Sequence, residues 1–172
     1  VASRALAISG ALAHADPGER AAARRMGAEG APVFWRLVAQ HGIAPHDEEK
    51  WLRITKLLAL LTPASATESV HEAGRDFGAV LADGGDARAR LEKPALSEQR
   101  LARLLAARET ARLDALERAV RALARNRPRV DVPSLAWSVL NDNARAIART
   151  YYARLDRRAD IAEIAEKETT ND

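Results

Sequence analysis

The sequence predicts an all-α fold, a bundle of about eight to ten helices, and three observations support this prediction. Apolar residues make up 47% of the chain and are mostly Ala and Leu, while aromatic residues make up only 4%. Such side chains lose little rotamer freedom in a helix, so the composition disfavours a β-sandwich or barrel. Apolar residues also recur at intervals of three and four, the helical period, and Gly and Pro separate the periodic segments.

Four helices are expected in the first third of the chain. Their expected ranges are 3–13, 17–26, 32–42 and 45–62. The third and fourth begin at prolines, which the first turn of a helix tolerates. Gly42 ends the third helix, and Thr62-Pro63 ends the fourth.

A fifth helix is expected to run from a capping box, formed by Ser65 and Glu68, to the turn at 83–86. In a capping box each side chain satisfies a free backbone N–H of the other residue. Gly74 and Gly78 weaken this helix, although glycines four residues apart also permit another helix to approach closely.

Three more helices are expected in the second half. Ser97 caps the first, and a long helix with an apolar Leu and Val face then ends near Asn126, because Arg127-Pro128-Arg129 cannot continue it. Asp131 is a suitable N-cap for the next helix, in which Leu135, Trp137 and Leu140 are expected to be buried.

A last long helix follows from 144, and its acidic end from 160 adds a turn or frays. The break between 83 and 94 is the one plausible subdomain boundary. We therefore expect either one bundle or two packed helical subdomains, an N-terminal one over 1–90 and a basic C-terminal one over 91–172 with an acidic tail.

Several classes of function are disfavoured by what the sequence lacks. Without cysteine there is no disulfide, no thiolate nucleophile and no Cys-ligated zinc or iron–sulfur cluster. No acidic pair joins His41 and His46 at a metal-binding spacing, and no phosphate-binding glycine-rich loop is present. Asp76-Phe77-Gly78 matches a kinase tripeptide but lacks the other kinase motifs. We expect no catalytic residues, no metal and no cofactor.

The sequence also contains no run of the roughly 18 apolar residues that a membrane span requires. Residues 4–15 resemble a secretory signal with an Ala-His-Ala cleavage site, but Ser9 and Gly10 interrupt the apolar stretch. We expect a cytoplasmic protein that does not contact a membrane.

Charge is distributed unevenly along the chain. Residues 1–87 contain 9 basic and 11 acidic side chains, residues 88–158 contain 17 and 8, and residues 159–172 contain 1 and 5. The codon usage of a GC-rich genome could explain 23 Arg against 4 Lys, but it would spread the arginines evenly. The asymmetry favours an anionic partner for the segment 88–158.

Helical geometry sorts the arginines of the long helix into two groups. Arg118, Arg121 and Arg125 lie opposite the apolar face, whereas Arg108 and Arg112 lie on its flank, one turn apart. Acidic residues four positions before Arg118 and Arg121 can pair with them, so the far face is also consistent with an ordinary solvated surface.

In the last helix, Arg145, Arg149 and Tyr152 form a second stripe. Guanidinium groups bind phosphate bidentately, and a tyrosine can stack on a base, which suits single strands held without sequence readout. We expect this stripe and the pair Arg108 and Arg112 to lie at least partly on one surface.

Four blocks in order resemble a known family. They are Phe34–Val38, Trp51–Leu58, Gly78–Ala82 and, most strongly, Leu96–Arg118. These blocks resemble the CasB family, the small subunits of the type I-E CRISPR Cascade complex. The resemblance rests on the order and spacing of the blocks, and it covers roughly residues 31–158.

The resemblance implies an all-helical, non-catalytic subunit acting in antiviral defence. It implies a head-to-tail pair of two copies that contacts other Cascade subunits. It also implies a basic surface that binds the target DNA strands, chiefly the displaced strand of the R-loop, and stabilises the assembly with the guide RNA. The positions that match the family's basic contacts are Lys56, Arg100, Arg108, Arg112 and Arg118. Arg145 and Arg149 complete the candidate nucleic-acid-binding set.

Two other interpretations remain open. A helical adaptor that binds only protein would show no steeply salt-dependent binding to oligonucleotides. A small helical transcription regulator would prefer a duplex site, but the sequence shows no helix-turn-helix with its tight glycine turn.

Overall fold

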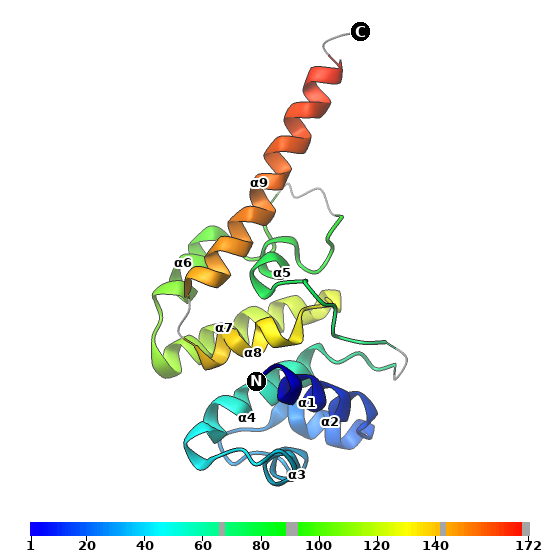
Figure 1. The fold of residues 1–172 in the computed structure, drawn as a ribbon, viewed down its shortest axis with the longest axis vertical. Coiled ribbons are helices and arrows are strands. Elements are labelled where there is room, and N and C mark those ends of the chain that lie inside the picture. The colour runs from blue at the N-terminus through cyan, green and yellow to red at the C-terminus, as the bar shows by residue number, and fades with distance from the viewer. Residues whose placement is uncertain (66–67, 89–92, 142–143, 170–172) are drawn as a thin grey trace.

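The computed structural model describes residues 1–65, 68–88, 93–141 and 144–169, without the side chains beyond 156, and these ranges contain nine α-helices and two short 3-10 helices (Figure 1). The α-helices are α1 (Ala2–His14), α2 (Pro17–Arg25), α3 (Pro32–His41), α4 (Glu48–Leu61), α5 (Phe77–Asp83), α6 (Glu98–Ala106), α7 (Glu109–Leu123), α8 (Val132–Leu140) and α9 (Ala144–Thr169). The 3-10 helices are Pro45–Asp47 and Ala124–Asn126. The described ranges contain no β-strand, so the all-α prediction is confirmed.

The helices are arranged in three tiers (Figure 1). Helices α1 to α4 lie at one end, α7 and α8 cross the middle, and α5, α6 and the start of α9 lie at the other end. Helix α8 packs against α1 and α4 at one end and against α5 at the other, and α7 packs against α4 and α6, so the middle tier joins the two ends.

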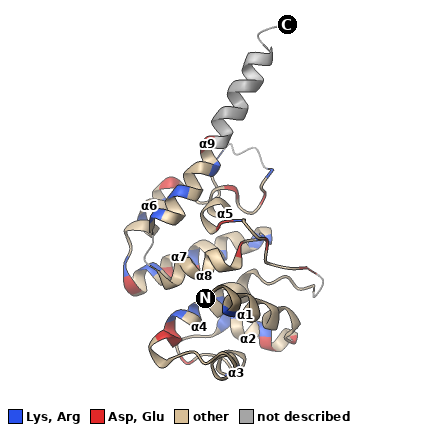
Figure 2. Ribbon diagram, viewed as in Figure 1, with Lys and Arg blue, Asp and Glu red and all other residues tan. Residues whose placement is uncertain are grey.

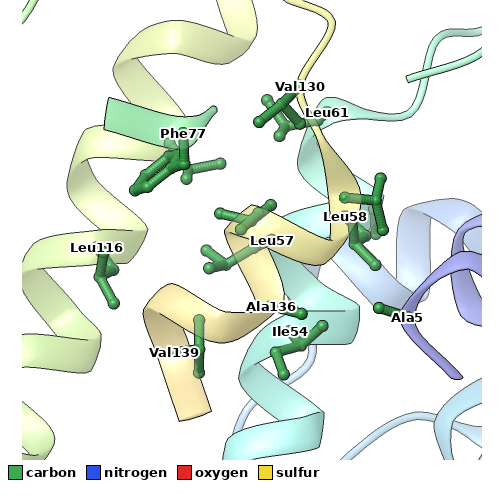
Figure 3. Close-up of a cluster of buried hydrophobic side chains, with 14 of the residues drawn as sticks. Ala5, Ile54, Leu57, Leu58, Leu61, Phe77, Leu116, Val130, Ala136 and Val139 are labelled. Atoms are coloured by element: carbon green, nitrogen blue, oxygen red, sulfur yellow. The ribbon is translucent and has the colours of Figure 1, made fainter. Parts of the chain in front are cut away.

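The buried apolar residues form one cluster that extends through these tiers. Figure 3 shows part of it, where Ile54 and Leu57 of α4 lie close to Ala136 and Val139 of α8. Burying a Leu or Ile side chain contributes about 1.5–3 kcal/mol, so this cluster is the main source of stability. The expected boundary near residue 90 stays a prediction; α5, which precedes it, packs chiefly against α9.

The N-caps predicted at Ser97 and Asp131 and the helix end predicted at Gly42 are confirmed, whereas the capping box predicted at Ser65 and Glu68 begins no helix in the described ranges. Ser97 Oγ accepts a hydrogen bond from the backbone N–H of Arg100, and Asp131 Oδ1 accepts one from Ser134 at 3.0 Å. Gly42 ends α3 in the left-handed region with φ of 57°, a conformation that glycine adopts without a Cβ penalty.

The helix predicted from residue 65 is wrong in its first half, because α5 begins only at Phe77. Around His71 the preceding chain is extended and pairs with a distant part of the chain. Val130 donates its N–H to the carbonyl of Val70 at 2.9 Å, and Glu72 donates to the carbonyl of Val130 at 3.1 Å. Gly74 follows with φ of 74°, which a helix does not allow.

The predicted close approach at Gly78 is confirmed. A Cβ at this position would collide with Oγ1 of Thr150 and with the carbonyl oxygen of Ile147, both on α9. Asp83, at the end of α5, also connects α5 to α9 through a buried ion pair. Its carboxylate lies 2.7 Å from Nε of Arg154 on α9 and 2.6 Å from Nη2 of Arg75.

The prediction that Trp137 is buried is wrong, because its side chain is 44% exposed. Leu135, Ala136 and Val139 form the packed face of α8 instead.

No helix in the described ranges combines the length and the hydropathy that a membrane span needs.

Candidate nucleic-acid interface

Three arginines line a groove of about 340 Å³ between α6 and α7. Arg100 and Arg103 lie one turn apart on the exposed side of α6, because Leu101 and Leu104 turn the other side into the core. Arg118 comes from α7. Ala115 and Ala119 of α7 also line this groove. We call it the α6/α7 groove.

The groove arginines are available to an external anion. All three are exposed, and none of them forms an ion pair with another described residue. Arg103 was not predicted from the sequence. Its position three residues after Arg100, on the same helix face, is the signal that could have identified it.

Arg108 is exposed but committed to a local structural role. It is the N-cap residue of α7, and its Nη1 donates to the carbonyl oxygens of Leu105, Ala106 and Ala107 at 3.0, 3.2 and 3.0 Å. A cation that binds the free carbonyls at the C-terminal end of a helix stabilises that end. Arg108 therefore closes α6 and orients the turn into α7.

Arg112 lies in the interior, with 2% of its surface exposed. Its Nη2 lies 3.4 Å from the carbonyl oxygen of Ser138 on α8. The expected exposed pair of Arg108 and Arg112 is therefore wrong. Arg112 precedes Leu116 by four residues, and residues at this spacing share a helix face, so it is buried together with that leucine.

Lys56 also lies away from the groove. Its side chain is 12% exposed, and Nζ lies 3.0 Å from Oε1 of Glu117 on α7. Glu117 also pairs with Arg53 of α4 at 2.7 Å and with Arg121 at 2.7 Å, which confirms the i,i+4 pair predicted for Arg121. Asp114 pairs with Arg53 at 2.9 Å rather than with a residue of its own helix.

Glu117 is held in its charged form. Burial raises the pKa of its carboxyl, but the hydrogen bonds and charges of Arg121 and Lys56 outweigh burial and lower the pKa below its ordinary value of 4.5. Lys56 therefore belongs to an ionic cluster that joins α4 to α7.

Arg145 and Arg149 lie exposed on the first turns of α9. Helix α9 packs beside α6, and Figure 2 shows basic residues on both helices. Tyrosines of α9 bind the start of α6, since Tyr151 donates to the carbonyl of Leu96 at 2.6 Å and Tyr152 donates to Oε2 of Glu98 at 3.2 Å. Burial raises the pKa of Tyr151 to about 12.

Arginine side chains dominate the charged groups of this interface. Within the described residues, no cluster of three histidine or acidic side chains could hold a metal ion. The arrangement suits recognition of an anionic polymer, because guanidinium groups of two neighbouring helices project from one part of the surface.

The family model for CRISPR-associated protein Cse2 matches residues 19–155. The chain belongs to the Cse2 family. The match includes most of α2, all of α3 to α8 and the start of α9, and it confirms the resemblance to the CasB family seen in the sequence.

A solved structure also has the Cse2 fold seen here. A chain in the crystal structure of E. coli Cascade bound to a PAM-containing dsDNA target superposes with a TM-score of 0.67. The two chains are 22% identical, and the similarity covers 88% of this chain and 96% of the other. No curated protein sequence matches the chain significantly.

Proposed function

We propose that this Cse2 family protein is the small subunit of a type I-E Cascade complex, and that it holds nucleic acid strands without reading their sequence. The α6/α7 groove carries this proposal, because its three arginines are exposed and lie beside the basic start of α9. Family membership and the shared fold with a chain of DNA-bound Cascade support it.

The chemistry of the groove fits strand holding. A guanidinium group donates two parallel hydrogen bonds to a phosphate, and phosphates are the same in every sequence. In RNA-guided recognition, base pairing supplies specificity, while contacts to the backbone shift a near-balanced strand exchange. Such contacts to the displaced DNA strand stabilise the R-loop, and contacts to the guide RNA stabilise the assembly.

The structure changes which residues we propose as contacts. Arg100, Arg103, Arg118, Arg145 and Arg149 are the proposed phosphate ligands, because their side chains are exposed. Arg108 acts by closing α6, while Arg112 and Lys56 act from the interior by holding α7 in place. We keep the head-to-tail pairing with a second copy as part of the proposal.

The test is fluorescence anisotropy of labelled single-stranded DNA at several salt concentrations. Each phosphate neutralised on a single strand contributes a slope of about −0.7 to log affinity against log salt. Replacing all three groove arginines with Gln should weaken binding to every sequence alike and make the slope shallower by about 2. The matched control replaces three exposed cations of α2, α3 and α4, namely Arg25, Arg36 and Lys50.

The control variant should bind like the wild type, although its net charge has changed by the same amount. Equal losses in both variants would show that net charge rather than the groove governs binding. If the isolated chain binds weakly, the same titration is repeated with the reconstituted complex, where other subunits can complete the site. If neither form shows a steep salt dependence, strand holding is excluded and the protein-interaction adaptor remains.

A further inference from the structure

A second hollow lies where α5, α8 and α9 meet. It has a volume of about 390 Å³, and its lining combines Trp137 with the apolar surfaces of Gly78, Ala146 and Ile147. Small-molecule sites are typically hollows of about 300–1,000 Å³ with apolar walls and a few polar groups. We call it the Trp137 cavity.

Trp137 is open to solvent, with 44% of this large aromatic side chain exposed. Polar groups also line the cavity. Asp76 and Asn141 are among them, and within the described part of the chain neither side chain hydrogen-bonds to the protein. An open indole beside free hydrogen-bonding groups matches a planar, polar-edged aromatic ligand.

The cavity adjoins the basic stripe of α9. Ala146 and Thr150 line the cavity wall, and Arg145 and Arg149 each immediately precede one of them. At 100° per residue, Arg149 lies 60° from Ala146 around the helix, which places it at the edge of the cavity. A strand that contacts the α9 stripe would therefore bring a base to the cavity.

We propose that the Trp137 cavity receives one unpaired nucleobase of a single strand, stacked on the indole of Trp137. Arg145 and Arg149 hold the flanking phosphates, and the side chains of Asp76 and Asn141 face the edge of the base. Every base has a π-face, so such stacking tolerates any sequence. This inference rests on the proposed strand-holding function and adds a base-binding site to it.

The test compares two strands of equal length, oligo(dT) and a fully abasic strand with the same phosphates. Trp137→Ala should weaken binding to oligo(dT) by about tenfold, because a stacked base contributes this much. It should leave binding to the abasic strand unchanged. The matched control is Trp35→Ala, which removes another tryptophan that is 44% exposed, on α3. Circular dichroism of both variants checks that the helices are intact.

A spectroscopic readout supplements affinity. In a Trp35→Phe background, Trp137 is the one exposed tryptophan, because Trp51 is buried. Its fluorescence should be quenched by oligo(dT) and not by the abasic strand.

Two results together would overturn the base site. The Trp137→Ala variant would bind oligo(dT) with wild-type affinity, and oligo(dT) would not quench Trp137 in the Trp35→Phe background. Strand holding would stand in that case if the abasic strand still bound with a steep salt dependence. If the wild type binds neither strand, alone or in the reconstituted complex, both proposals fail.

Discussion

Nζ of Lys56 on α4 lies 3.0 Å from Oε1 of Glu117 on α7, and this pair joins the first tier of helices to the second. The family resemblance predicts that Lys56 lies on the nucleic-acid surface. In the structure Lys56 instead helps to fix the position of α7, and α7 supplies one wall of the α6/α7 groove.

Replacing Lys56 with Ala should therefore reduce stability. It leaves Glu117, whose side chain is 13% exposed, with one fewer cation, which we expect to cost about 2 kcal/mol of unfolding free energy. Urea denaturation measures the change. Lys93→Ala, at an exposed position outside the helices, is the control and should change stability by about 0.5 kcal/mol or less. Equal effects of the two substitutions would contradict this role of Lys56.

The contribution of Glu117 should depend on pH. Because folding lowers its pKa, the stabilisation is fully present above the ordinary pKa of 4.5 and is lost as the pH falls through the folded value. Glu117→Gln should therefore destabilise the protein at neutral pH, and the difference from the wild type should shrink below pH 4.5. Urea unfolding at several pH values checks this. A difference that stays constant with pH would mean that packing, rather than charge, explains the effect.

Arg112 and Arg118 should behave in opposite ways. Arg112→Ala removes a fully buried side chain and should cost about 3 kcal/mol, since large losses follow from cavities and broken buried contacts. Arg118→Ala, at an exposed position, should leave stability nearly unchanged and weaken strand binding. Thermal unfolding and anisotropy, measured on both variants, separate the two roles. The prediction fails if Arg112→Ala leaves stability intact and weakens binding.

Gly78→Ala should destabilise the contact between α5 and α9. The added Cβ would overlap Thr150 and the backbone of Ile147, and overpacking of this kind costs about 1–3 kcal/mol. Gly10→Ala in α1 is the matched control, because a Cβ there meets no atom within 4 Å. Alanine favours a helix by about 1 kcal/mol over glycine, so the control should be neutral or stabilising. Destabilisation by both substitutions would argue against a special role of Gly78.

Most of the fold could be predicted from the sequence, because periodicity and helix caps are local signals. Ser97 and Asp131 start helices as predicted, and Gly42 ends one. The extended segment before α5 could not be predicted in the same way. Its backbone partner, Val130, lies about sixty residues further along the chain, and no local pattern shows such a pairing.

The candidate site was harder to predict than the fold. Charge density indicates the same region as the proposed groove, since the groove arginines lie within 88–158. It could not separate exposed cations from buried ones, because Arg112 contacts Ser138, 26 residues further along the chain, only once the chain has folded. The error at Trp137 is the opposite one. Its helical spacing from apolar neighbours predicts burial, but the fold leaves the side chain open to solvent.

The packing of α5 on α9 has a consequence for biosynthesis. Chains emerge from the ribosome N-terminus first, at about 5–20 residues per second, and a contact can form only when both partners have emerged. Phe77 and Gly78 are made early, but the residues that cover them follow about 70 positions later, as the 71-residue separation of Asp83 and Arg154 shows. The first tier can assemble during translation, whereas α5 stays uncovered until the start of α9 has emerged.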